Sequence, residues 1–166
     1  MSRFRSEALG GQSRAGFTSG NERIDHYFRT VVSQDIKRRY AACYILIEQA
    51  TDHIAGFYTL SASNILLTDI PENVARKLPR YPTVPAVLIG WLARENAYRG
   101  QDIDSLLLYD AIARIVAAPI GAHAIFVDAT DEAAAAFYIR HEFMPLQGNA
   151  RRLYLPVATA ERLMRE

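Results

Sequence analysis

One stretch of the sequence decides the fold of this chain: Ile89-Gly90-Trp91-Leu92-Ala93-Arg94-Glu95-Asn96-Ala97-Tyr98-Arg99-Gly100-Gln101-Asp102-Ile103-Asp104-Ser105, followed by Leu106-Leu107-Leu108. The apolar run from Ala86 to Ala93 predicts a buried β-strand, and apolar residues recur at helical spacing from Ile103 to Ile115. The polar turn between them therefore joins the end of a strand to the start of a helix. Backbone N–H groups without acceptors, together with the positive end of the helix dipole, make such a junction a site for an anion.

Composition and charge indicate an ordinary globular protein. The chain has 166 residues, 50% of them hydrophobic, and a formal net charge of +1, so we expect residues 1–166 to form a single domain. The net charge neither favours nor excludes nucleic acid, because a local basic patch can form within it. The one cysteine, Cys43, cannot form an internal disulfide, which favours a reducing compartment. Because no apolar run of about 20 residues and no signal peptide is present, we expect a cytoplasmic protein without a membrane span.

The remaining pattern predicts an α/β (α+β) fold with a mixed, mostly antiparallel sheet flanked by helices. Residues 1–16 are polar and either form an edge strand or stay loose. Further strands are expected at Ala41–Glu48, Ile54–Ser61, Gly121–Ala129, Phe143–Leu146 and Arg152–Pro156. Helices are expected from Glu22 to Val32, over Pro71–Lys77, from near Ser105 to Pro119, over Glu132–His141 and over Val157–Arg165.

The turn and its flanks resemble the acetyl-coenzyme A (acetyl-CoA) loop of GNAT N-acetyltransferases, a motif written Arg/Gln-x-x-Gly-x-Gly/Ala that holds the diphosphate of the cofactor. Arg99 stands at the first position of the motif, whereas Asp102 and Asp104 stand at its two glycine positions. The resemblance implies a GNAT-like fold with acetyl-CoA as cofactor. The residues that it implies for cofactor binding are Leu92, Ala93, Arg94, Arg99, Gly100, Gln101, Asp102, Ile103, Asp104 and Ser105.

From about Phe17 to Pro156 the chain resembles the toxin-like branch of the GNAT family, which belongs to type II toxin–antitoxin systems. The matching motifs are Phe17-x-x-Gly20 with Ile24-Asp25, Gly56-Phe57-Tyr58-Thr59-Leu60-Ser61, Leu78-Pro79-Arg80-Tyr81-Pro82-Thr83-Val84-Pro85, Val127-Asp128-Ala129, Phe137-Tyr138 with Phe143, and Leu153-Tyr154-Leu155-Pro156. This resemblance implies a toxin that acetylates the amino group of an aminoacyl-tRNA and so blocks translation. It also implies a small ribbon-helix-helix antitoxin as partner, and a homodimer.

The residues favour direct attack by the acceptor amine. The sequence contains no nucleophile–base spacing, and no cluster of residues with metal-ligand spacing. In the resembled family the tyrosine of the Phe-Tyr motif, here Tyr138, is the general acid that protonates the leaving thiolate, and a phenol of pKa about 10 can do so. The alternative is that Phe137 and Tyr138 form an aromatic pair that anchors a helix to the sheet.

The acceptor side departs from the toxin-like branch. That branch usually has arginine where Trp91 stands and an aliphatic residue where Arg94 stands, so this chain presents an aromatic side chain and a displaced positive charge. Three basic groups would suit a tRNA backbone if the fold brought them onto one face; otherwise they are scattered solvated charges. The groups are Lys37-Arg38-Arg39, Arg76-Lys77 with Arg80, and Arg151-Arg152.

The two aspartates predict a weakened cofactor loop. A positive φ at such a residue costs about 1–3 kcal/mol. A carboxylate about 4 Å from a phosphate charge is repelled by ~1 kcal/mol in water and ~4 kcal/mol at an effective dielectric near 20. A micromolar ligand is held by only about 8 kcal/mol. Alternatively, Asp102 or Asp104 N-caps a helix that starts near Ser105, but such a cap would occupy the same N–H groups.

Three functions remain open on the sequence. The first is an acetyl-CoA-dependent N-acetyltransferase that acts on aminoacyl-tRNA. The second is a catalytically silent relative that still binds an antitoxin or tRNA, because both motif glycines are replaced. The third is an acetyltransferase for a small amine or a protein lysine. Affinity for acetyl-CoA separates the second function from the other two.

Overall fold

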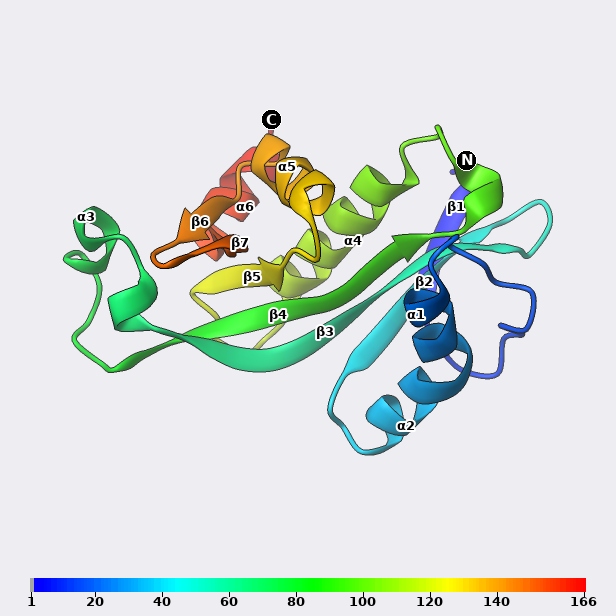
Figure 1. Cartoon of the computed structure of the whole chain (residues 1–166), viewed down its shortest axis with the longest axis horizontal. Coiled ribbons are helices and arrows are strands. Elements are labelled where there is room, and N and C mark those ends of the chain that lie inside the picture. The colour runs from blue at the N-terminus through cyan, green and yellow to red at the C-terminus, as the bar shows by residue number, and fades with distance from the viewer. Residues whose placement is uncertain (1) are drawn as a thin grey trace. The chain divides into compact units, whose positions relative to one another are not determined.

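Seven strands form one mixed sheet in the computed structural model, which describes residues 2–166, in the order β1-β2-β3-β4-β5-β7-β6 (Figure 1). The strands are β1 (Phe4–Ala8), β2 (Ala42–Glu48), β3 (Ile54–Leu66), β4 (Thr83–Arg94), β5 (Ala124–Asp128), β6 (Met144–Leu146) and β7 (Asn149–Pro156). The helices are α1 (Glu22–His26), α2 (Val32–Lys37), α3 (Glu72–Ala75), α4 (Ile103–Ala117), α5 (Glu132–Arg140) and α6 (Val157–Met164). β4 pairs with β5 in parallel, whereas β1–β2, β2–β3, β5–β7 and β6–β7 are antiparallel, which confirms the predicted fold class.

The described residues divide into two compact units, and β3, β4 and α4 each contribute to both. The first unit holds the residues up to Ser61 together with Gly90–Ala111. The second holds Ala62–Ile89 together with Ile112–Glu166. Between residues 2 and 166, no helix is both long enough and apolar enough to cross a bilayer.

In the first unit, α1 and α2 cover one face of the sheet. α1 begins where the sequence predicts, because the side chain of Asn21 accepts hydrogen bonds from the amides of Arg23 (3.0 Å) and Ile24 (3.3 Å). A π-helical turn, Tyr27–Val31, continues α1 into α2, so the helical segment extends beyond the predicted end at Val32 and is not α-helical throughout. Its apolar side contributes to a core of Phe17, Tyr27, Phe28, Val32, Cys43, Ile45, Ile47, Ile54, Phe57 and Ala93.

The first part of α4 covers the opposite face of the same strands. Phe57 points into the core just described, so its neighbour Gly56 points the other way. A β-carbon on Gly56 would lie 2.7 Å from Cδ1 of Leu107 and 2.9 Å from the carbonyl oxygen of Ala93. Glycine at this position therefore lets α4 pack closely against β3, at the end of the sheet where β4 finishes.

The second unit is built around β5. Residues Ala86–Ile89 of β4 pair with Ala124–Val127 on one edge of β5, and β7 pairs with its other edge. Asp131 caps α5 by accepting a hydrogen bond from the amide of Ala134 at 2.8 Å, which confirms the predicted start of this helix. The core of this unit contains Ile65, Ile70, Ala75, Val84, Ala86, Ala124, Phe126, Leu146 and Tyr154.

The structure decides the alternative left open for the N-terminal segment and moves the predicted starts of β7 and α4. Of the two alternatives for residues 1–16, the edge strand is confirmed, because β1 lies at the end of the sheet order. β7 begins at Asn149 rather than Arg152, since Gly148 forms the turn with φ +75° and pairing starts directly after it. The start of α4 was also predicted wrongly: it lies at Ile103 rather than near Ser105.

Candidate active site

The predicted strand-to-helix turn lies at the surface of the first unit. After β4, the side chain of Glu95 accepts a hydrogen bond from the amide of Ala97 at 2.5 Å and starts a 3-10 turn, Asn96–Tyr98. The four residues that follow, Arg99 to Asp102, are exposed, whereas Ile103 behind them is fully buried. The turn is therefore open to a ligand, as the sequence predicts.

Two residues of the turn have left-handed backbone conformations: Gly100 with φ +81° and Asp102 with φ +58°. The predicted backbone cost of an aspartate at a glycine position therefore applies to Asp102. It does not apply to Asp104, which lies inside the first turn of α4 and has no positive φ. Because α4 begins at Ile103, Asp102 stands at the N-cap position and Asp104 does not, so an N-cap at Asp104 is excluded.

Asp104 is instead paired with Arg94. Nη1 of Arg94 lies 2.8 Å from Oδ2 of Asp104, and both side chains are half-buried. The sequence identifies Asp104 as a departure from the cofactor motif and Arg94 as a departure from the toxin-like branch, and it contains no signal that they touch. The structure brings them together because the end of β4 lies beside the first turn of α4.

A hydrogen-bond network connects the turn to Arg3 and Glu48. Tyr98 is buried, and its hydroxyl donates to the carboxylate of Glu48 at 2.7 Å. Arg3 donates to the same carboxylate at 2.8 Å and, through Nη1, to Oε1 of Gln101 in the turn at 2.7 Å. The hydrogen bond from Tyr98, followed by that from Arg3, lowers the pKa of Glu48, whereas burial and then Glu48 raise the pKa of Tyr98. Arg3 and Glu48 are functional candidates that sequence reasoning missed, because they lie far from the turn along the chain.

Replacing Tyr98 with phenylalanine is expected to destabilise the protein in a pH-dependent way. The folded pKa of Glu48 is depressed, so the stabilisation it brings is present above its unfolded pKa and is lost as pH falls through the folded pKa. We therefore expect the variant to unfold at a lower urea concentration than the parent at about pH 7, and the difference to shrink toward about pH 3. Equal differences at both pH values would show that Glu48 is not the group involved.

The residues at the turn fit an anionic cofactor. The first amides of α4 have no acceptor within the helix, and their dipole favours negative charge. Nε of Arg94 is buried and has no hydrogen-bond partner among residues 2–166. Arg99 is exposed at the first position of the motif.

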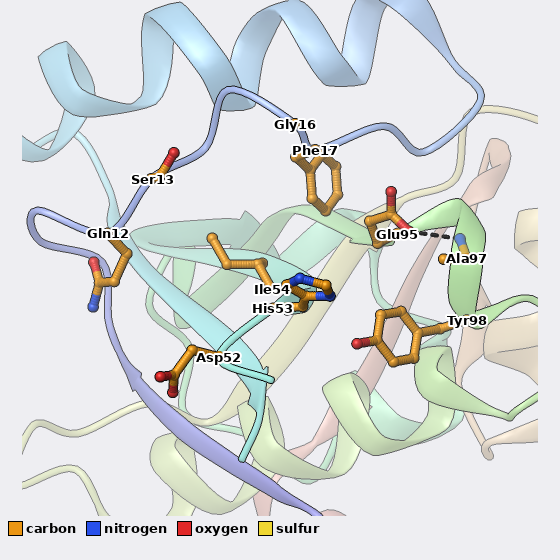
Figure 2. Close-up of a pocket in the computed structure, with 10 residues that line it drawn as sticks. All are labelled: Gln12, Ser13, Gly16, Phe17, Asp52, His53, Ile54, Glu95, Ala97 and Tyr98. Atoms are coloured by element: carbon orange, nitrogen blue, oxygen red, sulfur yellow. Dashed lines mark hydrogen bonds between the residues drawn. The ribbon is translucent and has the colours of Figure 1, made fainter. Parts of the chain in front are cut away.

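A cavity of about 490 Å³ lies within the first unit and is lined in part by the same segment (Figure 2). Tyr98 and Glu95 line it from the turn, and His53 and Phe17 line it from the neighbouring segments. Asp52 at its rim is bonded to Arg5 at 3.0 Å. The cavity therefore shares the 3-10 turn with the candidate site but not the exposed residues Arg99 to Asp102.

Trp91 on β4 is packed rather than free. Its ring stacks on Tyr27 at 4.1 Å between centroids, and the guanidinium of Arg23 lies 5.0 Å from its centroid. The amide of Trp91 donates to the hydroxyl of Thr59 at 3.0 Å. The aromatic side chain and the displaced positive charge that the sequence predicts are therefore both engaged within the first unit. Trp91 stacks on Tyr27, and Arg94 forms an ion pair with Asp104.

Tyr138 lies in α5 of the second unit and is buried. Its ring makes edge contacts with Phe137 at 5.1 Å and Phe143 at 5.3 Å between centroids. Both partners lie in α5 or just after it, so these contacts do not test the predicted anchoring of the helix to the sheet. Its role as general acid stays a prediction.

The three basic groups and the cysteine do not add to the candidate site. Lys37-Arg38-Arg39 lies in the first unit and the other two groups in the second, where Arg152 is committed to Asp128 at 2.7 Å. No cluster of His, Cys, Asp and Glu that could hold a metal occurs in the described part of the chain. Burial raises the pKa of the Cys43 thiol to about 12.

Two relatives match most of the chain. A probable toxin TacT of Sinorhizobium fredii is 30% identical over 160 residues, covering 91% of this chain and 88% of that protein. A tRNA-acetylating toxin of Mycobacterium tuberculosis is 33% identical over 129 residues, covering 76% of this chain and 75% of that protein. No protein-family model matches the chain.

Solved structures agree with this likeness. A Tyr-to-Phe variant of KacT gives a TM-score of 0.90 at 25% identity over 98% of this chain and 99% of that one. AtaT complexed with acetyl-methionyl-tRNAfMet gives 0.88 at 28% identity over 97% and 99%. AtaTR bound with acetyl-CoA gives 0.84 at 26% identity over 99% of each chain. The fold and its exposed strand-to-helix turn define a GNAT-type protein.

At this level of identity and coverage, the chain belongs to the GNAT-fold tRNA-acetylating toxins of toxin–antitoxin systems.

Proposed function

We propose that this chain transfers the acetyl group of acetyl-CoA to the amino group of an aminoacyl-tRNA and thereby blocks translation. The observation that carries the proposal is the exposed turn Arg99–Asp102, whose backbone and helix amides can hold a diphosphate, in a chain related to tRNA-acetylating toxins. The relative AtaT has been solved with acetyl-methionyl-tRNAfMet, and AtaTR with acetyl-CoA, which supports both substrates.

Each part of the proposed site has a separate task. Gly100, Gln101, Ile103 and Ser105, with Arg99, hold the diphosphate at the turn, while backbone groups of Leu92–Arg94 align the pantetheine arm and thioester. Acetyl-CoA supplies an activated acyl thioester. The acceptor amine attacks its carbonyl carbon, so that a C–N bond forms, the C–S bond breaks and the amine loses a proton to solvent water. Tyr138 donates its phenolic proton to the leaving thiolate and then regains a proton from solvent water.

The proposal extends to the partners of the protein. Membership of this toxin family favours a small ribbon-helix-helix antitoxin as binding partner and a homodimer as the assembly. A toxin that acts on aminoacyl-tRNA would work in the cytoplasm, where translation takes place. Coexpression with the product of a neighbouring small reading frame, followed by size-exclusion chromatography, tests both the partner and the dimer.

Mixing the purified protein with acetyl-CoA and a complete set of aminoacyl-tRNAs tests the reaction. We expect mass spectrometry to find an N-acetylated aminoacyl group on at least one tRNA, and a cell-free extract to lose translation only when acetyl-CoA is present. Binding of acetyl-CoA without any acetylated tRNA would contradict the proposal. Acetylated polyamines or lysines in the same assay would then support a different acceptor, and no acetylated product at all would support the catalytically silent relative.

A further inference from the structure

The pair Arg94–Asp104 connects the last residue of β4 to the first turn of α4, directly beside the exposed turn. The distance of 2.8 Å and the partial burial of both side chains (27% and 35% exposed) give a charge-assisted hydrogen bond that is protected from much of the solvent. No other partner of the Asp104 carboxylate is found among residues 2–166. The pair thus determines both the charge and the direction of that carboxylate.

A carboxylate in the first helical turn would otherwise oppose an anionic ligand in two ways. Its charge would repel the ligand, and its oxygens could compete with the ligand for the amides of the first helical turn. Pairing with Arg94 cancels the charge and engages the carboxylate at Oδ2. Arginine at the end of β4 therefore compensates for aspartate in the turn, and neither residue can be interpreted without the other.

We propose that Arg94 is a positioning residue for cofactor binding, which keeps the helix amides available to the diphosphate by neutralising and holding Asp104. This inference rests on the proposed function, because it takes acetyl-CoA as the ligand of the turn. It assigns the Arg94 side chain a role distinct from the backbone contacts predicted for that residue. Arg94 acts through Asp104, so its effect depends on the presence of that aspartate.

A double-mutant cycle with Arg94→Leu and Asp104→Gly tests the inference, with acetyl-CoA affinity measured by isothermal titration calorimetry. We expect Arg94→Leu alone to weaken binding by about tenfold or more, and the same change in the Asp104→Gly background to weaken it by about twofold or less. Arg94→Lys keeps the charge and is expected to retain most of the affinity, which separates the role of the charge from a loss of folding.

A second ligand distinguishes a positioning role of Arg94 from a general effect of the substitution on the structure. S-acetylpantetheine lacks the diphosphate, so Arg94→Leu is expected to leave its inhibition constant unchanged. Equal losses from Arg94→Leu in both backgrounds, or an equal loss for S-acetylpantetheine, would overturn the inference while leaving the proposed function intact. Absence of acetyl-CoA binding in all of the variants and in the parent chain would overturn the proposed function, and this inference with it.

Discussion

Replacing Asp102 and Asp104 with glycine together is expected to raise the affinity for acetyl-CoA by about tenfold or more, a change of about 1.4 kcal/mol. Asp102 has φ +58°, a conformation that glycine adopts without strain and that costs a residue with a β-carbon about 1–3 kcal/mol. Removing its carboxylate also removes a repulsion of ~1–4 kcal/mol for a phosphate charge at about 4 Å.

Asparagine variants divide this effect into its parts. Asp102→Asn with Asp104→Asn removes the charges but keeps a side chain that tolerates a left-handed backbone, so its gain should come from electrostatics alone. Glu132→Gln with Glu142→Gln makes the same change in net charge within the second unit and is the matched control, expected to leave the affinity unchanged. Calorimetry that finds the glycine variant no tighter than the parent would show that the aspartates do not weaken the cofactor loop.

Replacing Tyr138 with phenylalanine is expected to lower kcat for aminoacyl-tRNA acetylation by about 100-fold or more, with KM for acetyl-CoA changed little. The change removes only the hydroxyl, so the ring contacts with Phe137 and Phe143 remain and the protein should stay folded. Growth arrest on expression should disappear along with the activity. A structure of the relative KacT has been solved as a Tyr-to-Phe variant, which makes this a natural comparison.

Tyr154→Phe is the matched control for Tyr138. Tyr154 is also a buried tyrosine of the second unit, and its hydroxyl has no hydrogen-bond partner among residues 2–166. Removing that hydroxyl should therefore leave both the activity and the stability near those of the parent. If Tyr138→Phe retained full kcat, Tyr138 would have only the packing role that its aromatic contacts already indicate.

Local signals predicted much of the fold. Asn21 and Asp131 cap helices that begin where the sequence predicts, and Gly148 forms the turn between the last two strands. Each of these depends on neighbours within a few residues, which the sequence displays directly. The junction between β4 and α4 was found in the same way, from an apolar run followed by helical spacing.

Contacts between distant residues could not be predicted. Arg3 reaches Gln101, and Tyr98 reaches Glu48, only because antiparallel pairing places these segments at one end of the sheet. The pairing of Arg94 with Asp104 depends on where α4 begins, and the sequence placed that start too late. The helix begins at Ile103, directly after Asp102, whose φ of +58° is not helical.

The burial of Cys43 makes the chain convenient for site-specific labelling. It is the single cysteine of the sequence, it is only 3% exposed, and its raised pKa keeps the thiol protonated under ordinary conditions. A maleimide dye should therefore not react with Cys43 and should react only with a thiol introduced elsewhere. A cysteine in place of exposed Arg76 or Lys77 would give a fluorescent reporter for tRNA binding without first removing the native cysteine.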